Sequence, residues 1–453
     1  MTPLRTLKST LIRFFANRHW LAVAALGLSM ALGGCHSATA PETPATAAAA
    51  LLTPGPWRGE LAAQGQQIPF LFEVKTEANQ PVLYLINKGL NGEERLRCNE
   101  IAAAGDSVTV RLHVFEAALV LRAAGPGKLG GVWVKYDSKT PYRVPLTATA
   151  GPAPATAPAP ARNDANFSYT GTWRTTFQDE TGTSYPAVGI FKQTGSTLTA
   201  TFLTSTGDYR YLTGEVSGHK LRLSTFDGSH AFLFTAQNGP PEPIDLTKDY
   251  APNTLFGDFY AGKAGHETWV AFPDPSAQLP DADTLTYLKK GETRLNFKFP
   301  STAVGVSISP TYAKYRGKVL VLQILGSWCP NCLDESNFLA PWYAKNKQRG
   351  VEIIGLGYER SPDYAVAATR LRNLKTRLGI GYDLAVAGVS NKDSVARSLP
   401  QLAKFLAFPT TIFIDKKGAV RSIHTGFSGP GTGAYYAQEQ AHFERTVSKL
   451  LRE

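Results

Sequence analysis

The most informative segment of this chain is "KVLVLQILGSWCPNCLDES", residues 318–336. Its first eight residues are apolar apart from Lys318 and Gln323, which is typical of a strand buried on both faces of a sheet. Cys329 and Cys332 follow, two residues apart, at the start of a helical segment that runs to about Arg349. A thiolate at this position meets the positive end of the helix dipole and the free N–H groups of the first turn, and both stabilise the anion.

Besides a redox dithiol, three other interpretations of Cys329 and Cys332 are possible. A structural zinc site needs four ligands, and the sequence has neither a second Cys pair nor a spaced pair of histidines. A c-type haem would require His after Cys332, where Leu333 stands. A purely structural disulfide rarely follows a buried strand with Trp328 ahead of it. The pattern therefore favours catalysis, with Cys329 exposed to solvent as the nucleophile and Cys332 one turn further in as the resolving thiol.

The rest of residues 284–453 predicts an α/β sheet with helices on both faces. A second buried strand is expected at 351–358 and an amphipathic helix ends at Gly379. A shorter helix is expected at 394–405, followed by two strands joined by "KKG" and a terminal helix from Tyr435. His424, in the last of these strands, is interpreted as structural rather than catalytic.

Residues 317–453 resemble the TlpA/ResA-like thiol-disulfide oxidoreductases, membrane-tethered extracytoplasmic members of the thioredoxin superfamily. The quoted strand and loop, the segment "GVEIIGLGYERSPDYAVAATRLRNL" and the segment "FPTTIFIDKKGAVRSIHTGFSG" are similar to the family's motifs. The resemblance implies that Pro409 is a cis proline beside the dithiol, although a trans proline that starts an edge strand is the alternative. It implies a catalytic pair with no metal and no cofactor beyond the redox-active Cys329–Cys332 disulfide.

The same resemblance assigns roles to neighbouring residues. Glu335 would accept or supply the proton of Cys332, or, alternatively, would only complement the helix dipole. The expected catalytic residues are Cys329, Cys332 and Glu335, and the expected substrate-binding residues are Trp328, Pro330, Phe408 and Pro409.

The N-terminus predicts export and lipid attachment. A basic region is followed by "WLAVAALGLSMALG", an uncharged run too short to span a bilayer, where about 20 residues are needed. It ends in "LGGC", Leu32–Cys35, which resembles the lipobox of bacterial lipoproteins and implies cleavage of residues 1–34 and lipidation of Cys35. An ordinary signal peptide with a chance cysteine is the alternative. We therefore expect a protein of the cell envelope, anchored on an extracytoplasmic face.

Two all-β domains are predicted between the N-terminus and the dithiol. Low-complexity segments at 35–55 and 149–165 indicate a tether and a Pro/Ala linker, and they flank strand-like segments at 56–148 and 166–275. Both segments open similarly, with "GPWRGEL" and "GTWRTTF", which indicates a tandem duplication of a small sandwich or barrel. Neither contains a catalytic constellation, and Cys98 is interpreted as a buried structural thiol.

Composition limits the partners. The 453-residue chain has a formal charge of +11 but no dense block of Lys and Arg, which argues against nucleic acid. The expected partners are exported proteins that contain disulfides, a membrane thiol donor, and the bilayer through acylated Cys35. The expected function is that of a membrane-anchored reductase of disulfides in exported proteins, and an oxidase or isomerase is the alternative, because the residues between the cysteines do not fix the direction of electron flow. A third possibility is a binding protein whose β domains capture a partner, with the redox domain as an accessory.

Overall fold

A computed structural model describes residues 51–112, 115–137, 142–152, 167–240 and 251–453. The predicted signal peptide, the lipidation site Cys35 and most of both low-complexity segments lie outside these residues. None of the helices in the described ranges combines the length and the hydropathy that a bilayer crossing requires.

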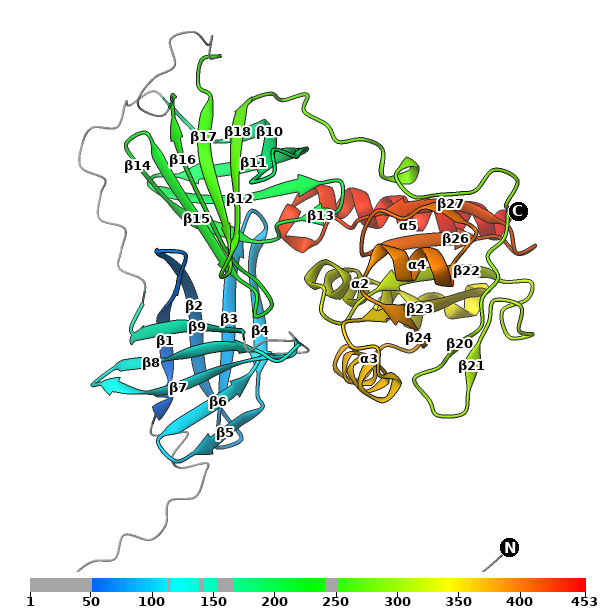
Figure 1. The fold of residues 1–453 in the computed structure, drawn as a ribbon, viewed down its shortest axis with the longest axis horizontal. Helices are drawn as coiled ribbons and strands as arrows, with labels where there is room; N and C mark the ends of the chain where they lie inside the picture. The colour runs from blue at the N-terminus through cyan, green and yellow to red at the C-terminus, as the bar shows by residue number, and fades with distance from the viewer. Residues whose placement is uncertain (1–50, 113–114, 138–141, 153–166, 241–250) are drawn as a thin grey trace, which may run out of the picture. The chain divides into compact units, whose positions relative to one another are not determined.

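The first β domain is a nine-stranded antiparallel sheet in the order β4-β3-β2-β1-β9-β8-β7-β6-β5 (Figure 1). Trp57 and Leu61 alternate with exposed residues along β1, so one face of the strand is buried. The described pairings leave the sheet open between β4 and β5. Its strands are β1 (Gly55–Ala63), β2 (Gln66–Glu77), β3 (Gln80–Gly89), β4 (Gly92–Cys98), β5 (Ile101–Ala104), β6 (Ser107–Arg111), β7 (Ala117–Gly125), β8 (Lys128–Lys135) and β9 (Tyr142–Ala150).

The second β domain closes into a barrel. Its strands follow the order β11-β10-β18-β17-β16-β15-β14-β12-β13, and an additional β11–β12 pairing joins the two ends of the sheet. Closed sheets remove the unpaired edges that open sheets expose. Its strands are β10 (Gly171–Asp179), β11 (Ser184–Thr194), β12 (Thr197–Thr204), β13 (Gly207–Asp208), β14 (Leu212–Ser217), β15 (Lys220–Phe226), β16 (Ala231–Asn238), β17 (Leu255–Ala261) and β18 (Gly265–Pro273).

The two β domains share one strand order, which supports the predicted duplication. In each domain the first strand lies between the second and the last, and the last four strands follow in reverse order. The opening tryptophans also make the same contact, because the indole N–H of Trp57 donates to the Thr53 carbonyl and that of Trp173 donates to the Tyr169 carbonyl. The difference is that β12 pairs with β14 in the second domain, whereas no described strand closes the first.

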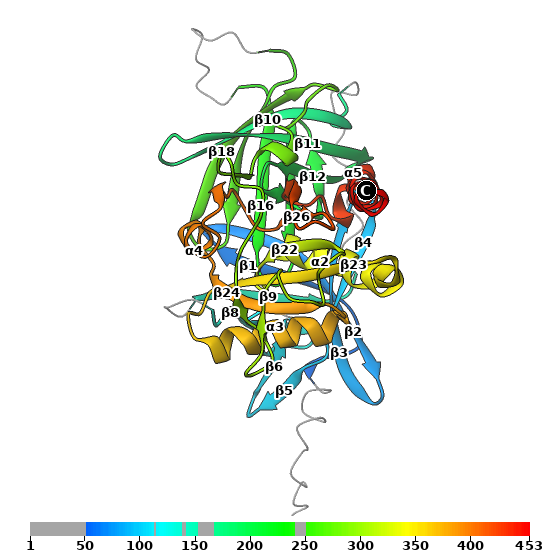
Figure 2. The same ribbon diagram turned by 90° about the vertical axis from the view of Figure 1, so that its right-hand side faces the viewer.

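The C-terminal domain is a five-stranded mixed sheet in the order β24-β23-β22-β26-β27, with helices on both faces (Figure 1 and Figure 2). Strands β22, β23 and β24 are parallel, whereas β26 and β27 are antiparallel to their neighbours. The predicted fold class, an α/β thioredoxin-like domain preceded by two all-β domains, is confirmed. The elements are β22 (Val319–Leu325), α2 (Pro330–Asn346), β23 (Val351–Glu359), α3 (Tyr364–Leu378), β24 (Asp383–Val389), α4 (Lys392–Ser398), β26 (Thr410–Ile414), β27 (Val420–Thr425) and α5 (Ala434–Arg452).

Short elements complete this domain. The single-turn helices are η1 (Ala282–Thr284), η2 (Lys347–Arg349) and η3 (Pro430–Thr432), and the short strands are β19 (Tyr287–Leu288), β20 (Phe299–Pro300), β21 (Ser307–Ile308) and β25 (Leu402–Lys404). Strand β25 overturns the expected helix at 394–405. Helix α4 ends at Ser398 because Pro400 cannot continue it, and the chain then pairs with β19.

Strand β22 is buried on both faces, as its largely apolar sequence predicted. Val319 and Val321 belong to the core that includes residues of α2, α3 and α5. Leu320 and Leu322 belong to the opposite core, which includes residues of α4. The two packed faces fix the carboxyl end of β22, and with it the loop that carries the cysteines.

Candidate active site

Cys329 is the N-cap residue of helix α2, and Pro330 occupies the first helical turn. The Cys329 sulfur accepts a hydrogen bond from the backbone N–H of Cys332 at 3.3 Å. The two sulfur atoms are 2.7 Å apart, so the pair points together as the spacing predicted. The sulfur of Cys329 thus takes the place of a capping oxygen, where the helix offers unpaired N–H groups to an anion.

The prediction that Cys329 meets solvent is wrong for this structure. Cys329 is 6% exposed and Cys332 is 1% exposed. The physical reason is that turns of the second β domain contact the loop on both sides of Cys329. The spacing of the cysteines places a sulfur at the start of a helix, but it does not indicate which residues of another domain contact that sulfur's loop.

The prolyl residue behaves as the resemblance implied, because the Phe408–Pro409 peptide bond is cis. The Cys329 sulfur lies 3.9 Å from the Phe408 carbonyl oxygen. The Trp328 ring packs edge-on against Phe408 with centroids 5.6 Å apart, and its indole N–H donates to the Tyr358 carbonyl. The structure therefore brings Trp328, Phe408 and Pro409 together beside the Cys329 sulfur.

Glu335 is buried in helix α2 and is 3% exposed, so it does not face solvent at the helix surface. Its carboxylate accepts hydrogen bonds from the Gln323 side chain at 2.8 Å and from the Thr411 hydroxyl. Burial raises the pKa of Glu335 to about 7, although these two hydrogen bonds oppose the rise. A carboxyl group with a pKa near neutrality can both take up and release a proton at physiological pH.

The surroundings of Cys332 oppose its ionisation. Burial raises the pKa of the Cys332 thiol well above its usual value, and the Cys329 sulfur and the charge of Glu335 act in the same direction. The protonated form of Cys332 is therefore favoured at neutral pH. A protonated thiol is not nucleophilic, so Cys332 can react only after a base removes its proton.

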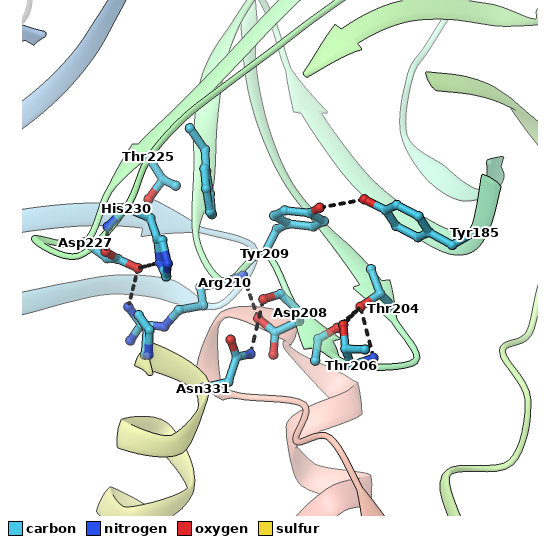
Figure 3. A pocket seen from close by; sticks show the side chains of 13 residues that line it. Tyr185, Thr204, Thr206, Asp208, Tyr209, Arg210, Thr225, Asp227, His230 and Asn331 are labelled. Carbon is cyan, nitrogen blue, oxygen red and sulfur yellow. Dashed lines mark hydrogen bonds and ion pairs between the residues drawn. The ribbon is translucent and has the colours of Figure 1, made fainter. Parts of the chain in front are cut away.

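Two turns of the second β domain form hydrogen bonds with this loop, and Figure 3 shows the turn of Asp208 with Asn331. The Asn331 side chain donates to the Asp208 carbonyl at 3.1 Å, and the Ser229 hydroxyl donates to the Trp328 carbonyl at 3.3 Å. A cavity of about 210 Å³ lies at this junction. Its lining includes Tyr185, Thr204, Tyr209, His230, Phe232 and Pro330.

Arg210 anchors the same contact. Its guanidinium donates two hydrogen bonds of 2.8 Å to the carboxylate of Asp334, two residues after Cys332, and another to Glu94 of the first β domain. Asp227 lies 3.8 Å away. Arg210 is 4% exposed, so its charge is compensated by these carboxylates rather than by water. Nearby, burial raises the pKa of Asp208 to about 7.

Sequence reasoning missed these covering residues. Asp208, Arg210 and Ser229 lie about a hundred positions before the dithiol, and no motif marks them. The unusual left-handed backbone of Arg210, with φ 56°, is also not visible in the sequence.

A second cluster of side chains lies around His424. Its Nδ1 is 2.7 Å from Asp283 and its Nε2 is 2.7 Å from Glu439. Burial opposes the charge of His424, but the hydrogen bonds to Asp283 and Glu439 raise its pKa to about 10. The ring of His442 packs against this ring at a tilt of 33°, with centroids 4.7 Å apart. His424, which the sequence indicates to be structural rather than catalytic, is thus part of a polar cluster.

The fold and the paired cysteines at a helix start define the chain as a thiol-disulfide oxidoreductase. Residues 289–438 match the Redoxin family. ResA of Geobacillus kaustophilus, described as a thiol-disulfide oxidoreductase, is 28% identical over 144 residues, which are 29% of this chain and 75% of the relative. ResA of Halalkalibacterium halodurans is 27% identical over 138 residues, 30% of this chain and 69% of the relative.

Among solved structures, a thiol:disulfide interchange protein from Chlorobium tepidum is 19% identical. The match covers 36% of this chain and 98% of that one, with a TM-score of 0.28. The C-terminal domain is thus similar to the Redoxin family and, at 27–28% identity, to the ResA proteins.

Proposed function

We propose that this protein is a lipid-anchored reductase of disulfides in exported proteins, working on an extracytoplasmic face of the cell envelope. The observation that carries the proposal is the geometry at Cys329: its sulfur caps a helix, lies 2.7 Å from the Cys332 sulfur and 3.9 Å from the Phe408 carbonyl. The predicted signal at 1–34 and lipidation at Cys35 supply the location and the anchor.

The proposed reaction begins with the Cys329 thiolate. It attacks one sulfur of a substrate disulfide, a mixed disulfide forms, and the other substrate sulfur leaves as a thiolate that takes up a proton. The Cys332 thiolate then attacks the Cys329 sulfur and releases the second substrate thiol. The substrate has gained two electrons, the enzyme holds the Cys329–Cys332 disulfide, and a membrane thiol donor returns two electrons to it.

Glu335 is proposed to take the proton from Cys332. It is on the same helix, three residues on, and burial raises its pKa to about 7. The carboxylate therefore becomes available in the pH range where the resolving step must occur. No chemistry beyond these side chains is required for the exchange.

Phe408 and Pro409, with Trp328 and Pro330, are proposed to hold the substrate. The Phe408 carbonyl already lies beside the attacking sulfur, and an extended peptide at this edge would pair with backbone groups as an added strand. Such docking is sequence-tolerant, which suits a reductase with several exported substrates.

A second candidate function gives the leading role to the β domains, which would capture a partner in the envelope. The contacts of Asp208 and Ser229 with the dithiol loop favour a joint role in which the second β domain controls access to Cys329. An oxidase or isomerase is separated from a reductase by the reduction potential of the pair. A reduction potential of about −120 mV argues against a reductase.

The test is insulin reduction by the purified protein with a dithiol as electron source. Cys329→Ser is expected to abolish turnover, and Cys332→Ser is expected to stop it after one mixed disulfide per chain. Cys98→Ser is the control, because Cys98 lies in β4 of the first β domain. The reductase activity of this variant should equal that of the unmodified protein. Full activity in both active-site variants would reject the proposal.

A further inference from the structure

The cluster around His424 has the composition and the geometry of a metal site. Asp283 comes from η1, His424 from β27, and Glu439 and His442 from α5. Glu439 and His442 are three residues apart, so they share a face of the helix. Four potential ligands from three separate elements therefore converge although no spacing motif links them in the sequence.

The distances among three of these groups fit one small cation. The ligand atoms of Asp283, His424 and His442 all lie within 4.8 Å of one another. The Asp283 oxygen is 2.7 Å from His424 Nδ1 and 3.5 Å from His442 Nε2. Around a tetrahedral zinc with bonds of about 2.0–2.1 Å, neighbouring ligand atoms lie about 3.3 Å apart. Small shifts of the side chains would thus bring all three to one ion.

Glu439 has the position of an orienting residue rather than a ligand. Its carboxylate is 2.7 Å from Nε2, the nitrogen of His424 that points away from Asp283. Metal-bound histidines commonly donate their second N–H to a carboxylate, which fixes the tautomer that presents a lone pair to the metal. Glu439 would therefore leave Nδ1 free of its proton and aimed at the ion.

His442 provides an independent indication of a missing partner. Its Nε2 is a buried atom that makes no hydrogen bond in the described structure, although it lies only 3.5 Å from the Asp283 carboxylate. Buried polar atoms of side chains nearly always have a partner. A cation between Nε2 and the carboxylate would satisfy both groups at once.

We propose that Asp283, His424 and His442 bind a divalent transition-metal ion of the Zn²⁺ class, with Glu439 orienting His424. Asp283 is the most exposed of the four, with 32% of its side chain accessible, so a solvent molecule completes the coordination from that side. The ion would tie η1 to β27 and α5, and it would not touch the dithiol.

The experiment uses the full-length protein in a Cys329→Ser, Cys332→Ser background, because the dithiol itself binds soft metals. Titration with Zn²⁺ by calorimetry and with Co²⁺ by visible absorption is expected to show one ion per chain. The Co²⁺ spectrum should be that of nitrogen and oxygen ligands, without a thiolate charge-transfer band.

Three variants locate the site. His442→Gln and Asp283→Asn are expected to abolish the stoichiometric binding, and Glu439→Gln is expected to retain it with about 10–100-fold lower affinity. His266→Gln is the matched control, because His266 forms a similar contact with Asp258 at 3.0 Å in the second β domain. Its metal binding should be unchanged.

The proposal is overturned if the parent protein binds no stoichiometric Zn²⁺ or Co²⁺. In that case the cluster is only an ion network in which a proton occupies His424. It is equally overturned if one ion still binds to both His442→Gln and Asp283→Asn. Thermal melting of the parent protein with and without Zn²⁺ gives a second readout, because a ligand bound only to the folded chain raises the melting temperature.

Discussion

The C-terminal domain contains two groups of reactive side chains, and they differ in what surrounds them. The dithiol of Cys329 and Cys332 is buried, and turns of the second β domain form hydrogen bonds with Trp328 and Asn331 on either side of Cys329. The cluster of Asp283, His424 and His442 is built within the C-terminal domain and is partly exposed. The loop of the dithiol is therefore in contact with another domain, whereas the histidine cluster is formed by its own domain alone.

Of the variants considered, Arg210→Ala is expected to increase the exposure of the dithiol most. Removing one partner of a buried ion pair costs about 3–5 kcal/mol, because Asp334 and Glu94 are left buried without compensation. If 1.4 kcal/mol of this cost falls on the contact between the two domains, the population of molecules with an exposed dithiol rises tenfold. The rate of Cys329 alkylation by iodoacetamide should therefore rise at least about tenfold.

Arg174→Ala is the matched control for this variant. Arg174 also belongs to the second β domain, but its ion pair with Asp274 lies at the surface, where such pairs contribute little. Circular dichroism verifies that both variants remain folded. An unchanged alkylation rate in a folded Arg210→Ala protein would show that the second β domain does not protect the dithiol.

Glu335→Gln tests the electrostatics within the dithiol region. Since the pKa of Glu335 rises from 4.5 to about 7 in the folded chain, the folded state binds more protons between these values. The stability that this group contributes is present below about pH 4.5 and is lost as the pH rises to 7. Glutamine has no such loss, so the variant should gain about 3 kcal/mol relative to the parent between pH 4 and pH 8.

Urea unfolding followed by tryptophan fluorescence at the two pH values measures this change. Glu444→Gln is the control, because its unfolding free energy should change with pH in the opposite direction relative to the parent protein. Burial opposes its ionisation, but hydrogen bonds from Ser448, Arg349 and Trp342 lower the pKa of Glu444, so the parent carboxylate stabilises the fold at high pH. Parallel pH profiles for Glu335→Gln and the parent protein would contradict a buried, proton-holding Glu335.

Ser229→Ala should produce a smaller change at the covering contact. It removes one neutral hydrogen bond, to the Trp328 carbonyl, which contributes about 1 kcal/mol. Alkylation of Cys329 should accelerate by no more than about fivefold. A rate as high as that of Arg210→Ala would mean that the hydroxyl, and not the ion cluster, holds the domains together.

The smallest effect is expected from chelation of divalent metals. Because the proposed site at Asp283 and His442 does not touch the cysteines, insulin reduction after treatment with EDTA should equal that of untreated protein. Lower activity that Zn²⁺ restores would show that the two groups of side chains are coupled.

The part of this structure that could be predicted is encoded in short contiguous segments. The buried strand, the paired cysteines and the proline before β26 lie in motifs whose geometry is local, so Cys329, Cys332 and Pro409 were placed correctly relative to one another. Strand β24 went unrecognised, and the helix expected at 394–405 was cut short by Pro400. These are places where one residue or tertiary pairing outweighs the local pattern.

The rest depends on contacts between distant positions. Asp208 and Ser229 reach the dithiol from about a hundred residues away, and Asp283 reaches His424 and His442 across more than a hundred. No spacing in the sequence records such proximity. The burial of Cys329 is therefore a property of the assembled chain and not of the motif that contains it.

The central claim, that Cys329 is the attacking thiol, is tested most directly by trapping. The Cys332→Ser protein is mixed with a disulfide-containing protein substrate, and the adduct is digested and mapped by mass spectrometry. The account predicts one mixed disulfide, on Cys329, and a larger yield when Arg210→Ala is also present. An adduct on Cys98, or no adduct while the protein still reduces insulin, would contradict it.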